Sequence, residues 1–364
     1  MSVDSNGETG PLAYDAAPLL ARAANADRRA DARLRKAVED FFLGSEDRLD
    51  DRARAALNVR LGAILRSTEQ ELRDHASPYL LSNGHEPKDV FGAPGTTARR
   101  LVDSGLLRDR KLVAELLSQV QQGLLEEGLR SNRPPGAAPG LLVRLIASAD
   151  GTVASTASAF QFASVSRTDP DAMTARELPE PLYRQLVWDL AAATRAGATS
   201  GAVPQGVIDE ALQSASRRML ATHDETTRLD DAAMRLAGAL IRFPDEIENH
   251  LVGAVEDGEL ALFGALLSKS LSVDFDEARL IVLDPDGDRL WVGLRALDVD
   301  RATIARIGLA LGDADPRRDI EAFADEIDAI AAVPSDRAKE ALAPLMLERD
   351  FRAALSDLRR ADAQ

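Results

Sequence analysis

Residues 227–242 read TRLDDAAMRLAGALIR, and their apolar positions recur every three or four residues. These positions are Leu229, Ala233, Leu236 and Leu240. Such spacing places them on one face of an α-helix, whereas a half-buried strand would alternate apolar and polar residues. A helix with one apolar stripe must bury that stripe against a neighbour. This stretch therefore predicts a helix packed among other helices.

The same periodicity continues on both sides of this stretch. Further helices are expected at roughly 140–148, 151–166, 178–196 and 205–223. Nearer the N-terminus, apolar stripes in 34–42 and 57–72 flank a polar break at 44–51. This pattern predicts a helical hairpin or small bundle that packs on itself or against a second copy of the chain.

The composition favours helices over sheets. Apolar residues make up 45% of the chain but aromatic residues only 4%, and alanine, leucine, arginine and glutamate are abundant. These residues lose little freedom in a helix, whereas sheets are rich in β-branched and aromatic residues. Helices paired by short links predict an all-α fold of irregular HEAT-like, α-solenoid-like repeats.

Proline and glycine mark the expected segment boundaries. The strongest break is SNRPPGAAPG at 131–140, because consecutive prolines cannot continue a helix. A stretch with three prolines and three glycines, 75–97, predicts a long loop. The expected segments are a disordered tail at 1–12, an N-terminal helical domain at 13–130, a linker at 131–140, a repeat domain at 141–312 and further helices at 313–364. Asp315 and Pro316 are expected to open one of these last helices.

An Asp-Gly turn recurs where one apolar stretch meets the next. It occurs at Asp150, Asp257 and Asp286. Aspartate at such a turn can accept the free N–H groups of the following helix, and glycine permits the chain reversal. The turns therefore predict helix-turn-helix units.

Several function classes are excluded or disfavoured by composition. The chain has no cysteine, which removes disulfides, thiolate metal sites and cysteine nucleophiles. We find no signal-peptide pattern and no apolar run of about 18 residues, so a cytoplasmic protein without a membrane span is expected. The net charge of −16 repels phosphate backbones, which makes nucleic acid an unfavoured partner. The arginine-rich stretch at 26–36 is interrupted by Asp27 and Asp31, so it predicts a solvated helix face.

The motif most suggestive of chemistry is Asp284-Pro285-Asp286-Gly287-Asp288-Arg289. Its alternating aspartates, Asp284, Asp286 and Asp288, resemble the magnesium loop of phosphohexomutases, because closely spaced carboxylates suit that ion. The phosphorylated serine motif and α/β domains of those enzymes are not visible in the sequence, however. A calcium loop would need glycine and glutamate where Arg289 and Arg295 stand. A third alternative is a β-hairpin, because Pro-Asp-Gly favours a tight turn.

Histidines and tryptophans give weaker signals. His75, His85, His223 and His250 are the histidines of the chain, none has zinc-site spacing, and surface positions are expected for them. FGAPGTT at 91–97 lacks the lysine of a phosphate loop and predicts a turn before a helix. No dinucleotide or nucleophile-elbow motif occurs. Two further residues are most consistent with core positions but are retained as possible exposed interaction anchors: Trp188 and Trp291.

Several strings together resemble one known family. They are LLARAANADRRADARLRKAVEDFF with GSEDRLDDRARAAL near the start, then LPEPLYRQLVWDLAAATR, ATHDETTRLDDAAMRLAGAL, EDGELALFGALL and ARLIVLDPDG. In this order they resemble the uncharacterised bacterial family called domain of unknown function 2336, over about residues 18–310. The resemblance implies a HEAT-like helical protein and brings no catalytic residues. It also implies that an aspartate triplet at 284–288 is not a fixed feature of the family.

From these observations we expect a non-catalytic scaffold or adaptor, not an enzyme, with no cofactor. Its partner would be a protein with basic patches, because the chain is acidic, and a homodimer is also compatible with the sequence. The alternatives are a magnesium-dependent phosphosugar enzyme centred on Asp284, Asp286 and Asp288, and a helical-repeat nucleic-acid binder. The sequence does not identify the partner.

Overall fold

The computed structural model describes residues 17–26, 29–30, 32–34, 36, 51–93, 95–104, 110–168, 175–198, 203–348, 351–352, 354–355 and 358. Over these residues every regular element is a helix, which confirms the all-α class. The α-helices are α1 (Ala17–Ala24), α3 (Asp51–Ser82), α4 (Pro87–Val90), α5 (Thr96–Ser104), α6 (Arg110–Asn132), α7 (Leu141–Ile146), α8 (Gly151–Thr168), α9 (Glu180–Gly197), α10 (Gln205–Ala221), α11 (Leu229–Leu240), α12 (Ile247–Glu256), α13 (Leu260–Leu271), α14 (Phe275–Leu283), α15 (Asp288–Ala296), α16 (Arg301–Ala314), α17 (Ile320–Ala331) and α18 (Ser335–Leu342). Short 3-10 helices are η3 (Ala175–Glu177), η4 (Glu225–Thr227), η5 (Pro244–Glu246) and η6 (Ala343–Met346).

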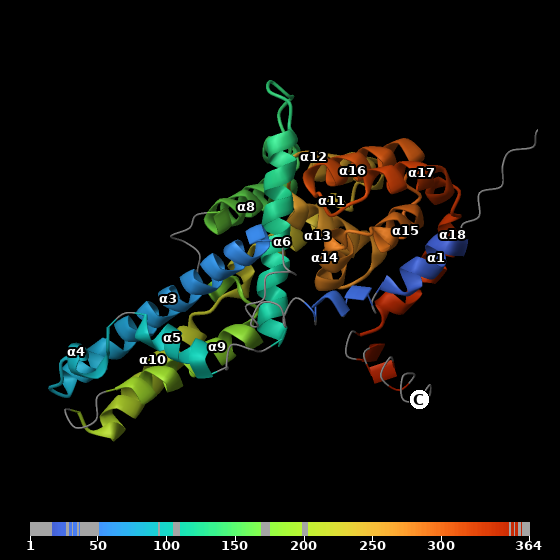
Figure 1. The fold of residues 1–364 in the computed structure, drawn as a ribbon. Helices are drawn as coiled ribbons and strands as arrows, with labels where there is room; N and C mark the ends of the chain where they lie inside the picture. The colour runs from blue at the N-terminus through green and yellow to red at the C-terminus, as the bar shows by residue number, and fades with distance from the viewer. Residues whose placement is uncertain are drawn as a thin grey trace, which may run out of the picture.

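The helices enclose two hydrophobic cores. The first core joins α3, α4 and α5 with α9 and α10, and its centre includes Leu72, Tyr183 and Leu190. These segments are separated in sequence by α7 and α8, which belong to the other core. Figure 1 shows α3, α5, α9 and α10 together as an elongated arm on one side of α6. The first core is therefore assembled from two stretches of chain that are distant in sequence.

The second core is built around α13. Residues 260–268 of this helix, LALFGALLS, are all buried, as expected for a helix that is apolar on every side. Helices α11, α12, α14 and α15 pack on it. Helices α7, α8 and α16–α18 contribute further residues to the same core, and α1 adds Leu19 and Ala23. Burying a side chain such as Phe263 contributes about 1.5–3 kcal/mol relative to leaving it in water. This core carries most of the apolar surface of the C-terminal half.

Helix α6 contributes to both cores. Leu116 and Val120, in its first half, belong to the first core, and Leu125 and Leu129 belong to the second. Figure 1 shows α6 standing between the arm and the group formed by α11–α18. One continuous helix thus ties the two cores together.

The predicted helices between residues 140 and 242 are confirmed to within a few residues at each end. Residues 133–140 lie between α6 and α7, where the proline-rich break was predicted. The β-hairpin alternative for the acidic motif is wrong, because α14 and α15 flank it. Helix-forming flanks with apolar residues on their inner faces outweigh the turn propensity of Pro-Asp-Gly.

Two other expectations need correction. The predicted loop at 75–97 is helical to Ser82, with Pro78 inside α3, because Leu72, Ala76 and Leu80 remain buried on one stripe. Asp315 does not open α17; Asp319 caps it by accepting from the N–H of Ala322 at 2.9 Å. Most of the first arm of the predicted N-terminal hairpin, and its turn, lie outside the described residues, so the hairpin stays a prediction. The preceding helix, α1, packs on α15 and α18.

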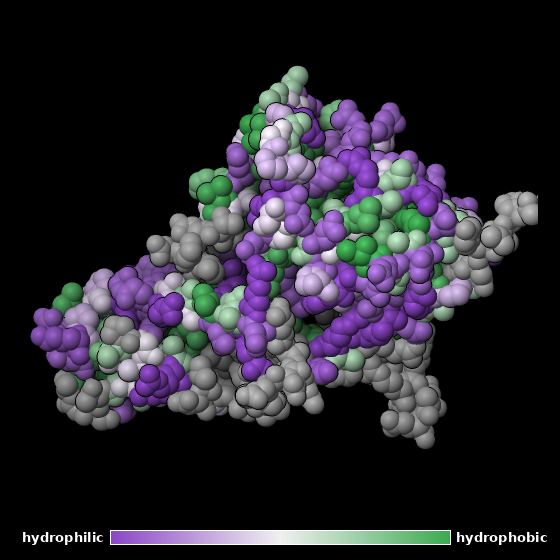
Figure 2. All heavy atoms as spheres, turned by 45° about the horizontal axis from the view of Figure 1, so that its top comes forward, coloured by the Kyte–Doolittle hydropathy of each residue, from purple (hydrophilic) through white to green (hydrophobic). Residues whose placement is uncertain are grey.

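No helix of the described residues is long and apolar enough to cross a membrane. Figure 2 shows one face of the molecule, mostly covered by hydrophilic residues and interrupted by smaller apolar patches. Among exposed apolar side chains, Phe162 and Val165 stand out on α8, whose other exposed residues are small or polar. Scattered apolar residues of this kind are usual on protein surfaces.

Candidate functional site

The acidic loop, residues 284–288, connects α14 to α15. Gly287 has a φ of +70°, a left-handed conformation that favours glycine. A Cβ atom at this position would lie 2.8 Å from the ring of Trp291. The N–H of Gly287 donates to the carbonyl of Asp284 at 3.2 Å, which closes the turn. The backbone of the loop is therefore fixed, and its three aspartates are presented from one tight turn.

All three aspartates of the acidic loop pair with arginines from the N-terminus. Nε of Arg22 donates to Asp288 at 2.9 Å, and Nη2 of Arg29 donates to the other oxygen of Asp288 at 2.5 Å. Arg33 donates to Asp284 at 2.5 Å and also to Asp286. Arg22 additionally pairs with Glu326 on α17. Charge-assisted hydrogen bonds of this kind are among the stronger polar contacts in proteins.

We name the N-terminal strap as residues 17–36, of which 27, 28, 31 and 35 are outside the described residues. Arg22, Arg29 and Arg33 are separated by seven and four positions, which places them on one helix face. All described residues of the strap other than Asn25 are helical. Leu19, Ala23 and Ala26 are buried beside them. The strap therefore contacts the second core and the acidic loop, through apolar side chains and arginines respectively.

Further charges lie behind the acidic loop. Arg318 donates to the carbonyl of Val282 at 2.6 Å and lies 3.7 Å from Asp315. Burial lowers the pKa of Arg318 to about 10, against the opposing effect of the Asp315 carboxylate. Oδ2 of Asp284 is buried and accepts no hydrogen bond from the described residues. The loop is thus a fixed anionic surface with one carboxylate oxygen still unpaired.

Within the described part of the chain, no group of three or more histidine, aspartate or glutamate side chains is arranged to hold a metal ion. Asp284, Asp286 and Asp288 instead each face a guanidinium group. A magnesium ion at this loop would have to displace these arginines and coordinate the same oxygens. The geometry of the acidic loop is accordingly that of an arginine-binding surface.

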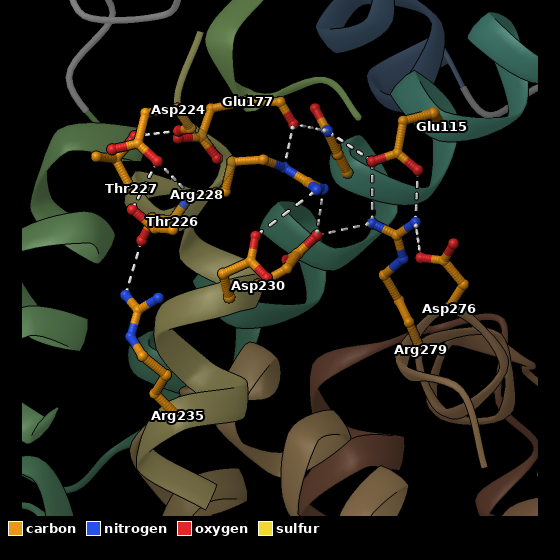
Figure 3. A network of polar contacts seen from close by, with 12 residues as sticks. Glu115, Glu177, Asp224, Thr226, Thr227, Arg228, Asp230, Arg235, Asp276 and Arg279 are labelled. Atoms are coloured by element: carbon orange, nitrogen blue, oxygen red, sulfur yellow. Dashed lines mark hydrogen bonds and ion pairs between the residues drawn. The ribbon is translucent and has the colours of Figure 1, made fainter. Parts of the chain in front are cut away.

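A second polar centre joins the two cores (Figure 3). Arg279 of α14 forms two hydrogen bonds with Glu115 of α6, at 3.0 and 2.5 Å, and both side chains are buried. Arg279 also donates to Asp276 at 3.0 Å and lies 3.5 Å from Asp230. Arg228 extends the network by pairing with Asp230 at 3.1 Å. Because Glu115 and Arg279 come from different parts of the chain, their pair fixes α14 against α6.

A cavity of about 390 Å³ lies beside this network. Its lining includes Arg228, Asp230 and Asp276, together with Glu277 of α14 and Arg352 from the C-terminal segment. Arg352 donates to Glu277, whose other oxygen accepts from Arg289 at 2.8 Å. The charged groups of the lining are therefore largely paired with one another, which is typical of a structural ion network.

The two tryptophans occupy different environments. Trp291 is only 6% exposed and packs against Phe323, with ring centroids 4.7 Å apart. It is a core residue, and its alternative role as an exposed anchor is wrong. Trp188 on α9 is 37% exposed and stays available as an interaction anchor.

The expectation of surface histidines is wrong for His250. It is buried in α12, where burial lowers its pKa, and its Nε2 lies 3.5 Å from Glu246. His223 stacks on Tyr183 with ring centroids 4.4 Å apart. His75 lies 4.0 Å from Glu71 one helical turn away. The described structure therefore does not bring these histidines together.

The three Asp-Gly turns differ in what the aspartate does. Asp150 accepts from the N–H groups of Thr152 and Val153 at 2.8 and 3.0 Å and so caps α8 as expected. Asp257 instead accepts from the N–H of Leu141 and caps α7, a different helix. Asp286 binds the arginines of the strap. Similar local sequence therefore serves three different contacts.

The arginine partners of the acidic loop were missed from the sequence. Arg29 and Arg33 lie in the stretch expected to be a solvated face, yet both contact the loop. The spacing of Arg22, Arg29 and Arg33 places all three on one helix face. This spacing was the feature of the sequence that could have indicated pairing with an acidic triplet. Sequence spacing alone does not state which of the many acidic groups they meet.

A protein-family model described as an uncharacterised protein conserved in bacteria, DUF2336, matches residues 143–343. The resemblance is confirmed, although the matched region begins later than residue 18 and extends beyond residue 310. Neither the curated proteins nor the solved structures give a significant match to this chain. Because the match covers more than half of its residues, the chain belongs to this bacterial family, DUF2336.

Proposed function

We propose that this protein is a non-catalytic scaffold of the bacterial cytoplasm that binds a partner protein, and that the acidic loop recognises an arginine-bearing helix. The observation that carries the proposal is the binding of Arg22, Arg29 and Arg33 by the three aspartates of the loop. The motif that most resembled a reactive site thus binds an arginine-bearing segment of the same chain. The strap provides a template for the partner.

The chemistry of the loop suits guanidinium groups. The Asp284 and Asp288 side chains are only 2% and 5% exposed, so their carboxylates have lost most of their water. Arginine compensates for that loss well, because its planar group donates several hydrogen bonds in a fixed geometry. Lysine offers a single compact charge and would satisfy fewer oxygens. The partner is therefore expected to present arginine.

The arrangement of the helices is compatible with an irregular HEAT-like stack, which we include in the proposal. Such stacks bind partners along extended surfaces without any reaction chemistry. The net charge of −16 would attract a basic partner over longer distances. Trp188 supplies a half-exposed aromatic side chain that a partner could cover.

The test uses the full chain with the strap arginines reversed. The open variant carries Arg22→Glu, Arg29→Glu and Arg33→Glu, which repel the acidic loop. A fluorescent peptide with the sequence of residues 17–36 should bind the open variant in an anisotropy titration, and binding should weaken as salt rises. The matched control adds Asp284→Asn, Asp286→Asn and Asp288→Asn to the open variant and should lose binding.

Circular dichroism first establishes that the open variant keeps the helical content of the wild type. With that content retained, an absence of peptide binding would contradict the proposal. Equal binding of a peptide with glutamine in place of its arginines would also contradict it, because recognition would then not depend on guanidinium groups.

A further inference from the structure

The strap occupies the surface that the proposed partner would need. Its arginines cover Asp284, Asp286 and Asp288, so a partner helix cannot reach these carboxylates while the strap is bound. Arg22 also pairs with Glu326, which extends the covered surface to α17. The strap belongs to the same chain and therefore competes at a high effective concentration.

The strap is attached by apolar contacts and by ion pairs. One leucine and two alanines, Leu19, Ala23 and Ala26, supply its fully buried apolar contacts. The guanidinium groups of Arg22, Arg29 and Arg33 keep roughly a third or more of their surface in contact with water. Partly solvated ion pairs are screened by salt, whereas apolar contacts are not. The ion pairs of the strap are therefore contacts that dissolved ions or a competing arginine helix can replace, which weakens its attachment.

One oxygen of the loop is left unused by the strap. Oδ2 of Asp284 is buried without a hydrogen-bond donor among the described residues, although the side chain is 98% removed from water. A buried carboxylate oxygen without a donor is unfavourable. A ligand that adds one donor at this position would bind the loop better than the strap does.

We propose that the N-terminal strap is an autoinhibitory segment, displaced by a partner helix that carries arginines at positions i, i+7 and i+11 and a further donor for Asp284. This inference rests on the proposed function and adds its regulation. The strap closes the acidic loop in the resting protein. A partner helix of higher affinity releases it and takes its place.

The chain has no cysteine, which permits a clean labelling experiment. Ala23→Cys places a thiol on the buried face of the strap. Ala239→Cys places a matched thiol in α11, in the same core. The two alanines are 7% and 6% exposed, so their protection in the closed state is alike. A maleimide reagent then reports how often each position opens.

We expect sodium chloride raised from about 0.05 M to about 0.5 M to accelerate labelling of Ala23→Cys by about tenfold. Peptide 17–36 should do the same when it is added in excess over the roughly millimolar effective concentration of the tethered strap. Labelling of Ala239→Cys should change by less than about twofold, because apolar packing holds α11. The same peptide with glutamine at its three key arginines should have no effect. Hydrogen exchange of residues 19–26 in the wild-type chain should rise with salt in parallel, which guards against an effect of the substitution itself.

Equal protection of the two thiols in salt and in peptide would overturn the inference, because the strap would then be a permanent part of the fold. That outcome leaves the proposed function intact when the open variant still binds the peptide. Failure of the open variant to bind is a separate result and removes both proposals. Sedimentation of a wild-type dimer that the open variant does not form would also overturn the inference, since the strap would then bind the loop of a second copy.

Discussion

The buried pair between Glu115 and Arg279 gives the sharpest energetic test of how the cores are joined. Burial alone would raise the pKa of Glu115, but the charge and hydrogen bonds of Arg279 more than offset this effect. The pKa of Glu115 is therefore below its ordinary value, and the carboxyl stays ionised. We compare Arg279→Met, Glu115→Gln and the double variant. Each single change removes one member of the pair and leaves the other in its buried position.

The two single variants should not cost the same. After Arg279→Met, the amide of Gln119 at 2.7 Å is the one donor to Glu115 that remains among the residues that the structure describes. We expect a loss of about 3–5 kcal/mol in the free energy of unfolding. After Glu115→Gln, Arg279 keeps Asp276 at 3.0 Å and Asp230 at 3.5 Å. The expected loss is then about 1–2 kcal/mol, because two carboxylates still compensate the guanidinium.

The double variant measures the coupling of the pair. It leaves no isolated charge at either position, so it should be about 2 kcal/mol more stable than the sum of the single losses implies. Urea unfolding followed by circular dichroism gives the free energy of unfolding of each protein. A larger loss for Glu115→Gln than for Arg279→Met, or a coupling within about 0.5 kcal/mol of zero, would refute the reasoning.

Three further outcomes follow from single sites. Burial and the nearby carboxylate of Glu126 raise the pKa of Glu259 from 4.5 to about 7, so the folded state keeps a proton that the unfolded state loses. The free energy of unfolding of the wild type should therefore fall between pH 4.5 and about 7. At about pH 8, Glu259→Gln should be more stable than the wild type by on the order of 3 kcal/mol. Urea unfolding of both proteins at about pH 5 and pH 8 checks this difference. Gly287→Ala should lower the free energy of unfolding by about 1–3 kcal/mol, because its φ is +70° and its Cβ would meet Trp291, whereas Gly151→Ala, which meets nothing within 4 Å, should not. Magnesium at millimolar concentration should leave the melting temperature of the wild type unchanged, because guanidinium groups already bind the acidic loop; a clear rise that Asp286→Ala removes would favour a metal site.

The helices were largely predictable because their signal is local. The stripe of Leu229, Ala233, Leu236 and Leu240 is buried as its spacing requires, and Asp150 caps α8 as its position suggests. In each case the residues that decide the outcome lie within about one or two turns of one another. Pro78 is the exception, since tertiary burial of its neighbours keeps α3 intact around it.

The candidate site was less predictable because its partners are distant in sequence. Asp288 was identified as a notable residue, but Arg22, its partner, lies 266 positions earlier. An acidic triplet has the same local pattern whether it binds a metal ion or arginines. Only the position of the strap beside the acidic loop distinguishes the two, and that position depends on the packing of α1 against α15 and α18.

The first core is assembled from two stretches of chain that are made at different times on the ribosome. Helices α3 and α5 are made early, but α9 and α10, which cover them, emerge only after α7 and α8. During that interval the nascent chain carries uncovered leucine stripes, the kind of surface that chaperones bind. The region shared with the family, 143–343, contains α9 and α10 without α3 and α5. Expressed as an isolated fragment, it would leave residues such as Tyr183 and Leu190 in water and should aggregate unless the preceding helices are supplied.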